Sequence, residues 1–191
     1  LADILSFDTK EADSNNKVTS SDIVKINVYY ECLCPDCRNF DTKQLMRAIF
    51  VLNKYIDLKT YPYGNAEVNG KVEFKCQHGP AECYGNMLHA CALDLLSSRT
   101  KAQLFNVCLM DYNYSDEVCG RQMAIDPQPI KQCAKGQKGI ELLKYYGDQS
   151  KSVNYTYVPF ILVNGKETSA DDFFRDVCSE IEHPPTVCNE V

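Results

Sequence analysis

The sequence lacks any apolar run long enough to cross a membrane. Its longest uninterrupted stretch of aliphatic or aromatic residues runs only from Ala48 to Leu52, whereas a transmembrane helix needs about 20 such residues. A basic tract is also missing, and 20 lysines and arginines against 26 aspartates and glutamates give a net charge of −6. We therefore expect neither membrane insertion nor nucleic acid binding. No signal peptide is visible at Leu1, as expected of a mature or trimmed form.

Cysteine is the residue that the sequence has in excess, with 11 in 191 positions. Cytosolic thiols are kept reduced, so this density favours an oxidising secretory route over the cytosol. Two N-glycosylation sequons, at Asn113 and Asn154, agree with such a route. We therefore expect the chain to be a glycoprotein of the secretory pathway.

The first half of the chain has the pattern of an α/β protein. Residues 1–22 are mostly polar and predict a loose N-terminal arm. Alternation from Val24 to Tyr30 predicts a strand with one buried face, and it assigns Glu31 to the opposite, polar face. Apolar residues at helical spacing then predict a helix from Leu45 to Ile56, and residues 58–63 predict a second strand.

Residues 66–150 differ in character, because they hold six cysteines and several short helical patterns. After them, residues 157–163 predict a strand, Asn164-Gly165 predicts a hairpin turn, and residues 169–181 predict an amphipathic helix. This order predicts one α/β domain over residues 23–191, with an inserted helical subdomain at about 66–150.

The segment ECLCPDCR at 31–38 contains the candidate catalytic residues, Cys34 and Cys37. If Cys34 is the N-cap of a helix, Pro35 occupies the first helical position, which suits its fixed φ. Cys37 is then the third helical residue and lies close enough to Cys34 for a reversible disulfide. Free backbone N–H groups and the helix dipole would stabilise a thiolate at Cys34. We therefore expect a redox couple.

Two neighbours complicate this couple. The charge of Asp36 should disfavour the Cys34 thiolate, although Asp36 could instead only stabilise the first helical turn. Cys32 follows the buried face of the preceding strand, so we expect a core residue rather than a third redox thiol.

The dipeptide Val158-Pro159 begins an apolar strand, where a proline is unusual. A cis peptide bond would explain it, since cis bonds are mostly X-Pro. In thioredoxin-like folds a cis-proline faces the two redox cysteines and helps to receive the substrate backbone. Val158 and Pro159 are therefore candidate substrate-binding residues, and an edge-strand trans proline is the alternative.

Residues 76–91, CQHGPAECYGNMLHAC, match the pattern Cys-Gln-His-Gly-x2-Glu-Cys-x2-Asn-x4-Cys at every fixed position. This segment resembles the signature of the gamma-interferon-inducible lysosomal thiol reductase family. The segments VYYECLCPDC, PYGNA at 62–66 and YVPFILVNGK at 157–166 also resemble that family, so the similarity extends from about Val24 to Cys188.

The resemblance implies a thioredoxin-like fold and reduction of protein disulfides in acidic endosomes or lysosomes, or after secretion. It implies that Cys34 is the nucleophile and Cys37 the resolving cysteine. Cys32 departs from the usual pattern of the family. The partners implied are disulfide-containing proteins, and no cofactor is needed beyond an external thiol reductant.

Eight further cysteines are expected to form four structural disulfides of unknown pairing. They are Cys76, Cys83, Cys91, Cys108, Cys119, Cys133, Cys178 and Cys188. Proximity favours three pairs, Cys76–Cys83, Cys108–Cys119 and Cys178–Cys188. A zinc site made of Cys76, His78, Cys83 and Cys91 is the alternative, but an oxidising compartment argues against it, and we expect no metal. His78 and His89 are then packing or surface residues.

Two other functions fit the same residues. A secreted, disulfide-stapled binding protein of this fold would have little or no reductase turnover, and Cys32 could trap the couple in an unproductive pairing. An oxidase or isomerase would differ from a reductase only in redox potential. The intact Cys34–Cys37 pair favours the enzyme.

Overall fold

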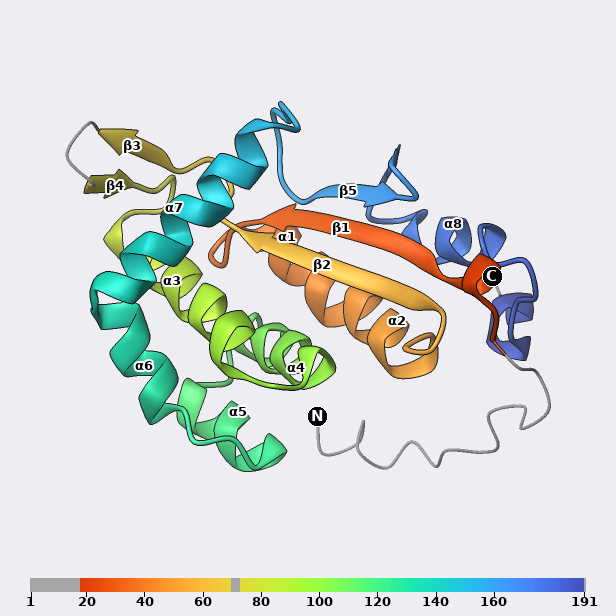
Figure 1. Cartoon of the computed structure of the whole chain (residues 1–191), viewed down its shortest axis with the longest axis horizontal. Coiled ribbons are helices and arrows are strands. Elements are labelled where there is room, and N and C mark those ends of the chain that lie inside the picture. Colours follow the sequence, from red (N-terminus) through yellow and green to blue (C-terminus); the bar gives the residue numbers. More distant parts are fainter. Residues whose placement is uncertain (1–17, 70–72, 191) are drawn as a thin grey trace.

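A four-stranded mixed sheet lies at the centre of the structure, with the strand order β2-β1-β5-β6 (Figure 1). The structure is a computed structural model that describes residues 18–69 and 73–190. The sheet strands are β1 (Val24–Tyr30), β2 (Ile56–Pro62), β5 (Phe160–Val163) and β6 (Lys166–Thr168). β1 and β2 are parallel, whereas β5 is antiparallel to both β1 and β6. A separate hairpin joins β3 (Glu67–Asn69) to β4 (Glu73–Lys75).

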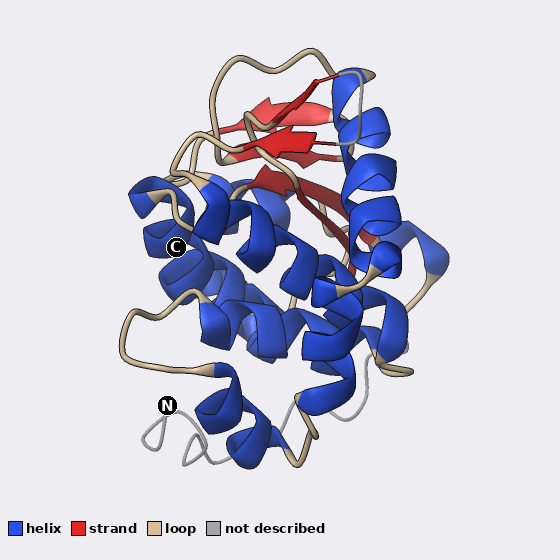
Figure 2. Ribbon diagram, turned by 90° about the vertical axis from the view of Figure 1, so that its left-hand side faces the viewer, coloured by secondary structure: helices blue, strands red, loops and turns tan. Residues whose placement is uncertain are grey.

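The helices fall into two groups along the chain. The first follows β1 after a short loop and is a continuous run of α1 (Pro35–Phe40), the π-helical segment η2 (Asp41–Leu45) and α2 (Met46–Val51). The second lies between β4 and β5: α3 (Pro80–Leu95), α4 (Arg99–Leu109), α5 (Asp116–Met123), α6 (Gln128–Lys135) and α7 (Gln137–Lys151). The short helices η1 (Ser20–Asp22), α8 (Phe173–Ser179) and η3 (Thr186–Glu190) lie near the ends of the described chain. Figure 2 shows the strands together at the top and most of the helices below them.

Two apolar cores hold these groups together. The larger core packs one face of β1 and β5 against α1, α2 and α8, with Val28, Phe40, Ile161 and Phe173 fully or almost fully buried. The second core lies within the helices between β4 and β5 and contains Phe105 and Ile130. The helical insertion therefore has an apolar interior of its own, which explains how it can extend beyond the sheet.

Disulfides staple both regions. Cys91–Cys133 and Cys108–Cys119 cross the second core, Cys76–Cys83 ties β4 to the start of α3, and Cys178–Cys188 joins α8 to the C-terminal segment. Three of these are the pairs that proximity favours in the sequence. All three cysteines of the alternative zinc set are in disulfides, so they are not available as thiolate ligands.

Several predicted boundaries are wrong. Ile56 is not helical, because α2 ends at Val51 and a turn follows it. Ile56 instead begins β2 and pairs with Val24 of β1. The strand predicted from Tyr157 begins only at Phe160, after the Val158–Pro159 bond. The C-terminal helix begins at Phe173 rather than residue 169, because the Ser169 side chain bonds to Asp172 in a turn before it.

The expected hairpin turn is confirmed by the structure. Residues 164 and 165 form the predicted hairpin turn, and both have positive φ. Most of the predicted N-terminal arm, residues 1–17, lies outside the described residues. At the end of the predicted arm, the Asp22 carboxylate accepts hydrogen bonds from the backbone N–H groups of Thr19 and His183. Within the described parts of the chain, none of the helices is long and apolar enough to span a bilayer.

Candidate active site

Cys34 is the N-cap of α1, at the end of the loop that follows β1. Pro35 occupies the first helical position, and the backbone N–H of Cys37 donates to the Cys34 sulfur over 3.4 Å. The two side chains therefore meet on the first turn of α1, as the sequence predicts. Both cysteines are free thiols; Cys34 is 7% exposed and Cys37 is fully buried.

This geometry makes the two sulfurs unequal. A hydrogen bond from the Cys37 thiol, helped by the backbone N–H groups of Asp36 and Cys37, lowers the pKa of Cys34 to about 6, although burial opposes it. Burial and the same hydrogen bond raise the pKa of Cys37 far above its ordinary value. Cys34 is thus the sulfur that ionises first and can attack a disulfide.

The segment before β5 lies directly against Cys34. The Val158–Pro159 peptide bond is cis, and the Val158 carbonyl oxygen is 3.8 Å from the Cys34 sulfur. This carbonyl lies just before the paired part of β5, so its segment can present backbone groups to an extended chain bound beside Cys34. The structure brings together the four candidate catalytic and substrate-binding residues.

Cys32 points away from this couple and toward α3. Its sulfur lies 3.5 Å from the Glu82 carbonyl oxygen, and its backbone N–H donates to the Asn86 side chain over 2.9 Å. A Cβ atom at Gly85 would overlap the Cys32 sulfur, so a glycine is required there. Burial raises the pKa of Cys32 to about 12, which leaves it a thiol in acidic and neutral solution.

Glu31 is buried, contrary to the prediction that it lies on the polar face of the first strand. The chain leaves the sheet after Tyr30, so the alternation that assigned Glu31 to solvent ends one residue earlier. Its carboxylate is 1% exposed and accepts a hydrogen bond from the backbone N–H of Asn65. Gly64, with a φ of 60°, packs so closely on this carboxylate that a side chain there would overlap it.

Glu31 forms a cluster with His78 and Glu82. The Nδ1 atom of His78 is 2.7 Å from Glu82 Oε2 and 3.3 Å from Glu31 Oε1. The three groups are close enough together to be considered as ligands of a cation. However, the shortest distance is that of a hydrogen bond, and the imidazole already shares its nitrogen with Glu82, so we assign no metal to them.

Comparison with known proteins places these residues in a family. The model of the family "Gamma interferon inducible lysosomal thiol reductase (GILT)" matches residues 25–137. The chain belongs to this family. The gamma-interferon-responsive lysosomal thiol protein of Arabidopsis thaliana is 34% identical over 182 residues, which cover 87% of this chain and 76% of that protein. The gamma-interferon-inducible lysosomal thiol reductase of Mus musculus is 30% identical over 181 residues, with coverage of 88% and 73%.

Solved structures agree on the fold. Oxidised BdbD from Bacillus subtilis has a TM-score of 0.60 at 12% identity, and the match covers 87% of this chain and 91% of that one. At such low identity the similarity concerns the fold alone, which is the expected thioredoxin-like fold with a helical insertion. Family and fold together identify the protein as a thiol–disulfide oxidoreductase acting on protein disulfides.

The GILT signature segment, residues 76–91, borders the loop that carries Cys34. Asn86 accepts from the Cys32 backbone and lies 3.5 Å from the Tyr63 carbonyl oxygen, while Glu82 belongs to the buried cluster. Sequence reasoning assigned this segment a structural role through its disulfides and treated His78 as a packing or surface residue. Its contact with the active-site loop was missed, since nothing local relates residue 31 to residues 78–86.

The other histidine of the signature segment, His89, does lie in the interior. Its Nδ1 atom is 2.8 Å from the Tyr30 hydroxyl, and burial lowers the pKa of His89 to about 3. It therefore remains neutral even in acidic solution. The predicted glycosylation sites Asn113 and Asn154 are both exposed, as an attached glycan requires.

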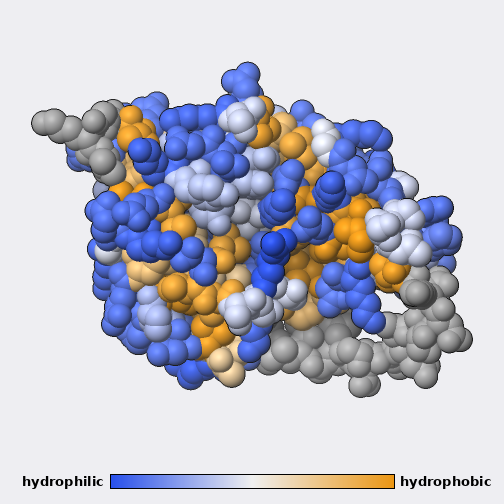
Figure 3. Space-filling view, in the orientation of Figure 1, coloured by the Kyte–Doolittle hydropathy of each residue, from blue (hydrophilic) through white to orange (hydrophobic). Residues whose placement is uncertain are grey.

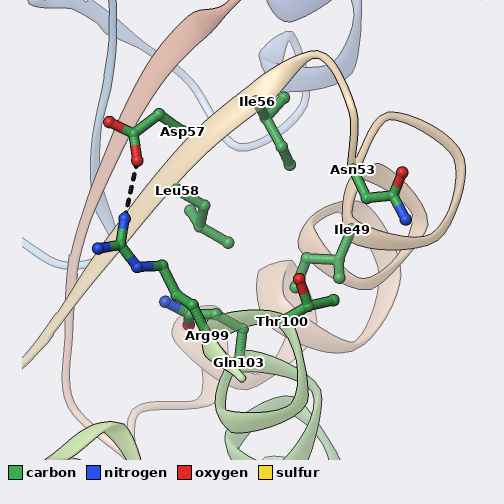
Figure 4. A pocket seen from close by; sticks show the side chains of 8 residues that line it. All are labelled: Ile49, Asn53, Ile56, Asp57, Leu58, Arg99, Thr100 and Gln103. Carbon is green, nitrogen blue, oxygen red and sulfur yellow. Dashed lines mark hydrogen bonds and ion pairs between the residues drawn. The ribbon is translucent and has the colours of Figure 1, made fainter. Parts of the chain in front are cut away.

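A separate cavity of about 120 Å³ lies between β2, α2 and α4 (Figure 4). Its rim carries an ion pair between Arg99 and Asp57, at the end of the sheet where β1 begins, whereas Cys34 follows the other end. The cavity therefore lies apart from the candidate active site. It is also smaller than the several hundred Å³ usual for small-molecule sites. Figure 3 shows hydrophobic and hydrophilic residues interspersed over one face of the molecule.

Proposed function

We propose that this protein reduces disulfide bonds of other proteins in acidic surroundings, with Cys34 as nucleophile and Cys37 as resolving cysteine. The observation that carries the proposal is the pairing of Cys34, at the N-terminus of α1, with a buried Cys37 that donates to it. A thiolate is the attacking species, so a low pKa at Cys34 is what acid activity requires.

The exchange proceeds in two steps. The Cys34 thiolate attacks one sulfur of a substrate disulfide, forming a mixed disulfide and expelling the other substrate sulfur as a thiolate, which takes a proton from water. Cys37 then loses its proton and attacks the Cys34 sulfur, releasing the second substrate thiol and leaving a Cys34–Cys37 disulfide. The substrate gains two electrons, and an external thiol reductant returns two electrons to the enzyme; no organic cofactor or metal takes part.

Substrate binding is assigned to Val158 and Pro159. The Val158 carbonyl oxygen next to Cys34 can accept a hydrogen bond from the backbone of an extended substrate segment. Backbone recognition of this kind suits unfolded or partly degraded proteins, which expose both their main chain and their disulfides. We infer that the substrates are such proteins.

Two observations support an assignment of the compartment, the structural disulfides and the name of a relative. Four disulfides require an oxidising route, and the mouse relative carries a lysosomal name. We infer passage through the secretory pathway to endosomes or lysosomes, or release from the cell, with glycans at Asn113 and Asn154.

The test is reduction of a disulfide-linked protein with a small thiol as reductant, at pH near 5 and near 7. We expect turnover at both pH values for the wild type and none for Cys34→Ser. Turnover that survives Cys34→Ser would contradict the mechanism. A folded wild type that binds but does not reduce any disulfide-linked protein would favour the binding-protein alternative, and net oxidation of a reduced substrate would favour an oxidase.

A further inference from the structure

The exchange reaction makes no use of Glu31, His78 or Glu82, although they form a buried cluster next to the loop that carries Cys34. Glu31 is the residue that follows β1, His78 lies in the loop before α3, and Glu82 lies in the first turn of α3. The two carboxylates are 1% and 0% exposed, whereas the imidazole is 34% exposed. The cluster therefore has a buried anionic side and one group that exchanges protons with solvent.

Backbone donors fix the outer oxygen of each carboxylate. Asn65 N–H donates to Glu31 Oε2 over 2.9 Å, and His78 N–H donates to Glu82 Oε1 over 2.9 Å. The inner oxygens both face the Nδ1 atom of His78. Glu31 Oε1 accepts no hydrogen bond, because Nδ1 lies closer to Glu82. Glu31 Oε1 thus has a lone pair available to take up a proton.

Charge explains why this proton matters. Two carboxylates and one imidazolium carry a net charge of −1, and burial makes that charge unfavourable. Burial and the neighbouring Glu82 raise the pKa of Glu31, although the Asn65 N–H and His78 oppose them. Protonation of Glu31 in acid would make the cluster neutral.

A short length of chain connects the cluster to Cys34. The Cys34 backbone N–H donates to the Glu31 carbonyl oxygen over 3.4 Å, which fixes the loop between them. The Glu31 charge disfavours the Cys34 thiolate, and the Cys34 thiolate in turn favours the protonated form of His78. Cys32 and Tyr155 are also influenced by the Glu31 charge, and both stay protonated; the Tyr155 hydroxyl donates to the Gly64 carbonyl oxygen.

We propose that Glu31, His78 and Glu82 are positioning residues that couple proton uptake to the reactivity of Cys34. As the surroundings acidify, Glu31 takes up a proton and its negative charge beside Cys34 disappears. The thiolate then declines less steeply with falling pH than that of an isolated thiol. This role rests on the proposed function and assigns the charged residues of the signature segment a part in acid activity.

A purely structural role is the competing explanation, since Glu82 also accepts from the N–H of His78 where α3 begins. Such a role would change the stability of the protein but not the shape of the Cys34 titration. Two coupled groups titrate over a wider pH range than one. The shape of the curve therefore separates the two explanations.

The experiment measures the rate at which iodoacetamide alkylates Cys34 in the reduced protein from pH 4 to 8, by mass spectrometry of the Cys34 peptide. We expect a curve broader than a one-proton titration for the wild type and a one-proton curve for Glu31→Gln. The variant should react about threefold faster in the pH range where Glu31 is still charged and Cys34 is only partly ionised. The two rates should converge toward low pH, as Glu31 takes up its proton, and at pH 8, where Cys34 is almost fully ionised.

Glu73→Gln is the matched control, because Glu73 is an exposed carboxylate on β4; its curve should superimpose on that of the wild type. Identical curves for Glu31→Gln and the wild type would overturn the proposal, as would a constant ratio at all pH values. If Glu31→Gln does not fold, His78→Gln replaces it. Loss of the imidazolium should slow alkylation at pH 5 about threefold, and an unchanged rate would overturn the proposal.

These measurements need no disulfide substrate. A chain that never reduced a protein disulfide would refute the proposed function while leaving the titration intact. A one-proton titration of the wild type would refute the coupling while leaving the reductase mechanism intact. Repeating the titration after dialysis against EDTA should give the same curve, and a curve that narrows would show that a bound cation, not a proton, causes the effect.

Discussion

The Cys37 backbone nitrogen lies 3.4 Å from the Cys34 sulfur, and the Cys37 thiol donates to the same sulfur. The resolving cysteine therefore activates the nucleophile before it takes part in the exchange. With a pKa of about 6, roughly a tenth of Cys34 is thiolate at pH 5, against about 0.03% for an ordinary cysteine. The Cys34–Cys37 pairing thus accounts for much of the thiolate available in acid.

Cys37→Ala should raise the pKa of Cys34, because it removes the thiol donor but keeps the backbone N–H groups. The thiolate is favoured above its pKa and lost as pH falls through it, so raising the pKa lowers reactivity most in acid. We expect alkylation of Cys34 at pH 5 to slow about tenfold. Cys32→Ala is the control and should titrate like the wild type, since the Cys32 sulfur contacts α3 instead. An unchanged rate in Cys37→Ala would contradict the assigned hydrogen bond.

Asp36→Asn tests the charge that the sequence places between the two cysteines. The sequence predicts that this change lowers the pKa of Cys34, since it removes a neighbouring negative charge. Asp36 is exposed, however, so solvent screens its carboxylate, and its backbone N–H, which favours the thiolate, is retained. We expect a faster alkylation rate at pH 5, by about twofold or less. A change larger than that of Glu31→Gln would show that Asp36, not Glu31, is the carboxylate that restrains Cys34.

The two disulfides of the helical core should differ in their contribution to stability. Cys91–Cys133 closes a separation of 42 residues and Cys108–Cys119 one of 11, and both are packed in the same core. The chain-entropy model gives about 4 and about 3 kcal/mol respectively. The variant with alanine at both 91 and 133 should therefore unfold at lower denaturant concentration than that with alanine at 108 and 119. The opposite order would mean that packing, not loop closure, dominates.

Local chemistry in the sequence was sufficient to predict the site's central feature. Pro35 after Cys34 marks a helix start, and the structure has Cys34 at the N-cap. Asn164-Gly165 predicts its hairpin in the same way. These features depend on a few adjacent residues, so a single sequence contains the information.

The surroundings of the site could not be predicted in this way. Glu31 was assigned to solvent because strand alternation was extended one residue past the end of β1. Its partners His78 and Glu82 are about fifty residues away in the chain, and no periodicity relates them. Ile56 was assigned to a helix since it continues the helical spacing, but pairing with Val24 in β1 prevails over that local pattern. Contacts distant in sequence thus decided each of these positions.

Gly85→Ala should destabilise the protein through a single contact, with the Cys32 sulfur. The nearest atoms to a Cβ at Gly85 are those of the Cys32 side chain, and the sulfur is too close for the two to coexist without movement. Overpacking a buried position costs about 1–3 kcal/mol, and we expect a loss of that size in the free energy of unfolding. Cys32→Ala removes the sulfur, so the double variant should recover most of the loss.

The comparison also tests the role of Cys32. Denaturant unfolding of the wild type, the two single variants and the double variant gives the coupling energy between residues 32 and 85. If Cys32 is a core residue, the double variant should lose much less stability than the sum of the two single losses. Reductase activity should persist in Cys32→Ala and in the double variant. Additive effects would mean that the overlap is relieved elsewhere. Loss of turnover in a well-folded Cys32→Ala would instead make Cys32 a participant in the redox chemistry, because packing alone cannot explain that result.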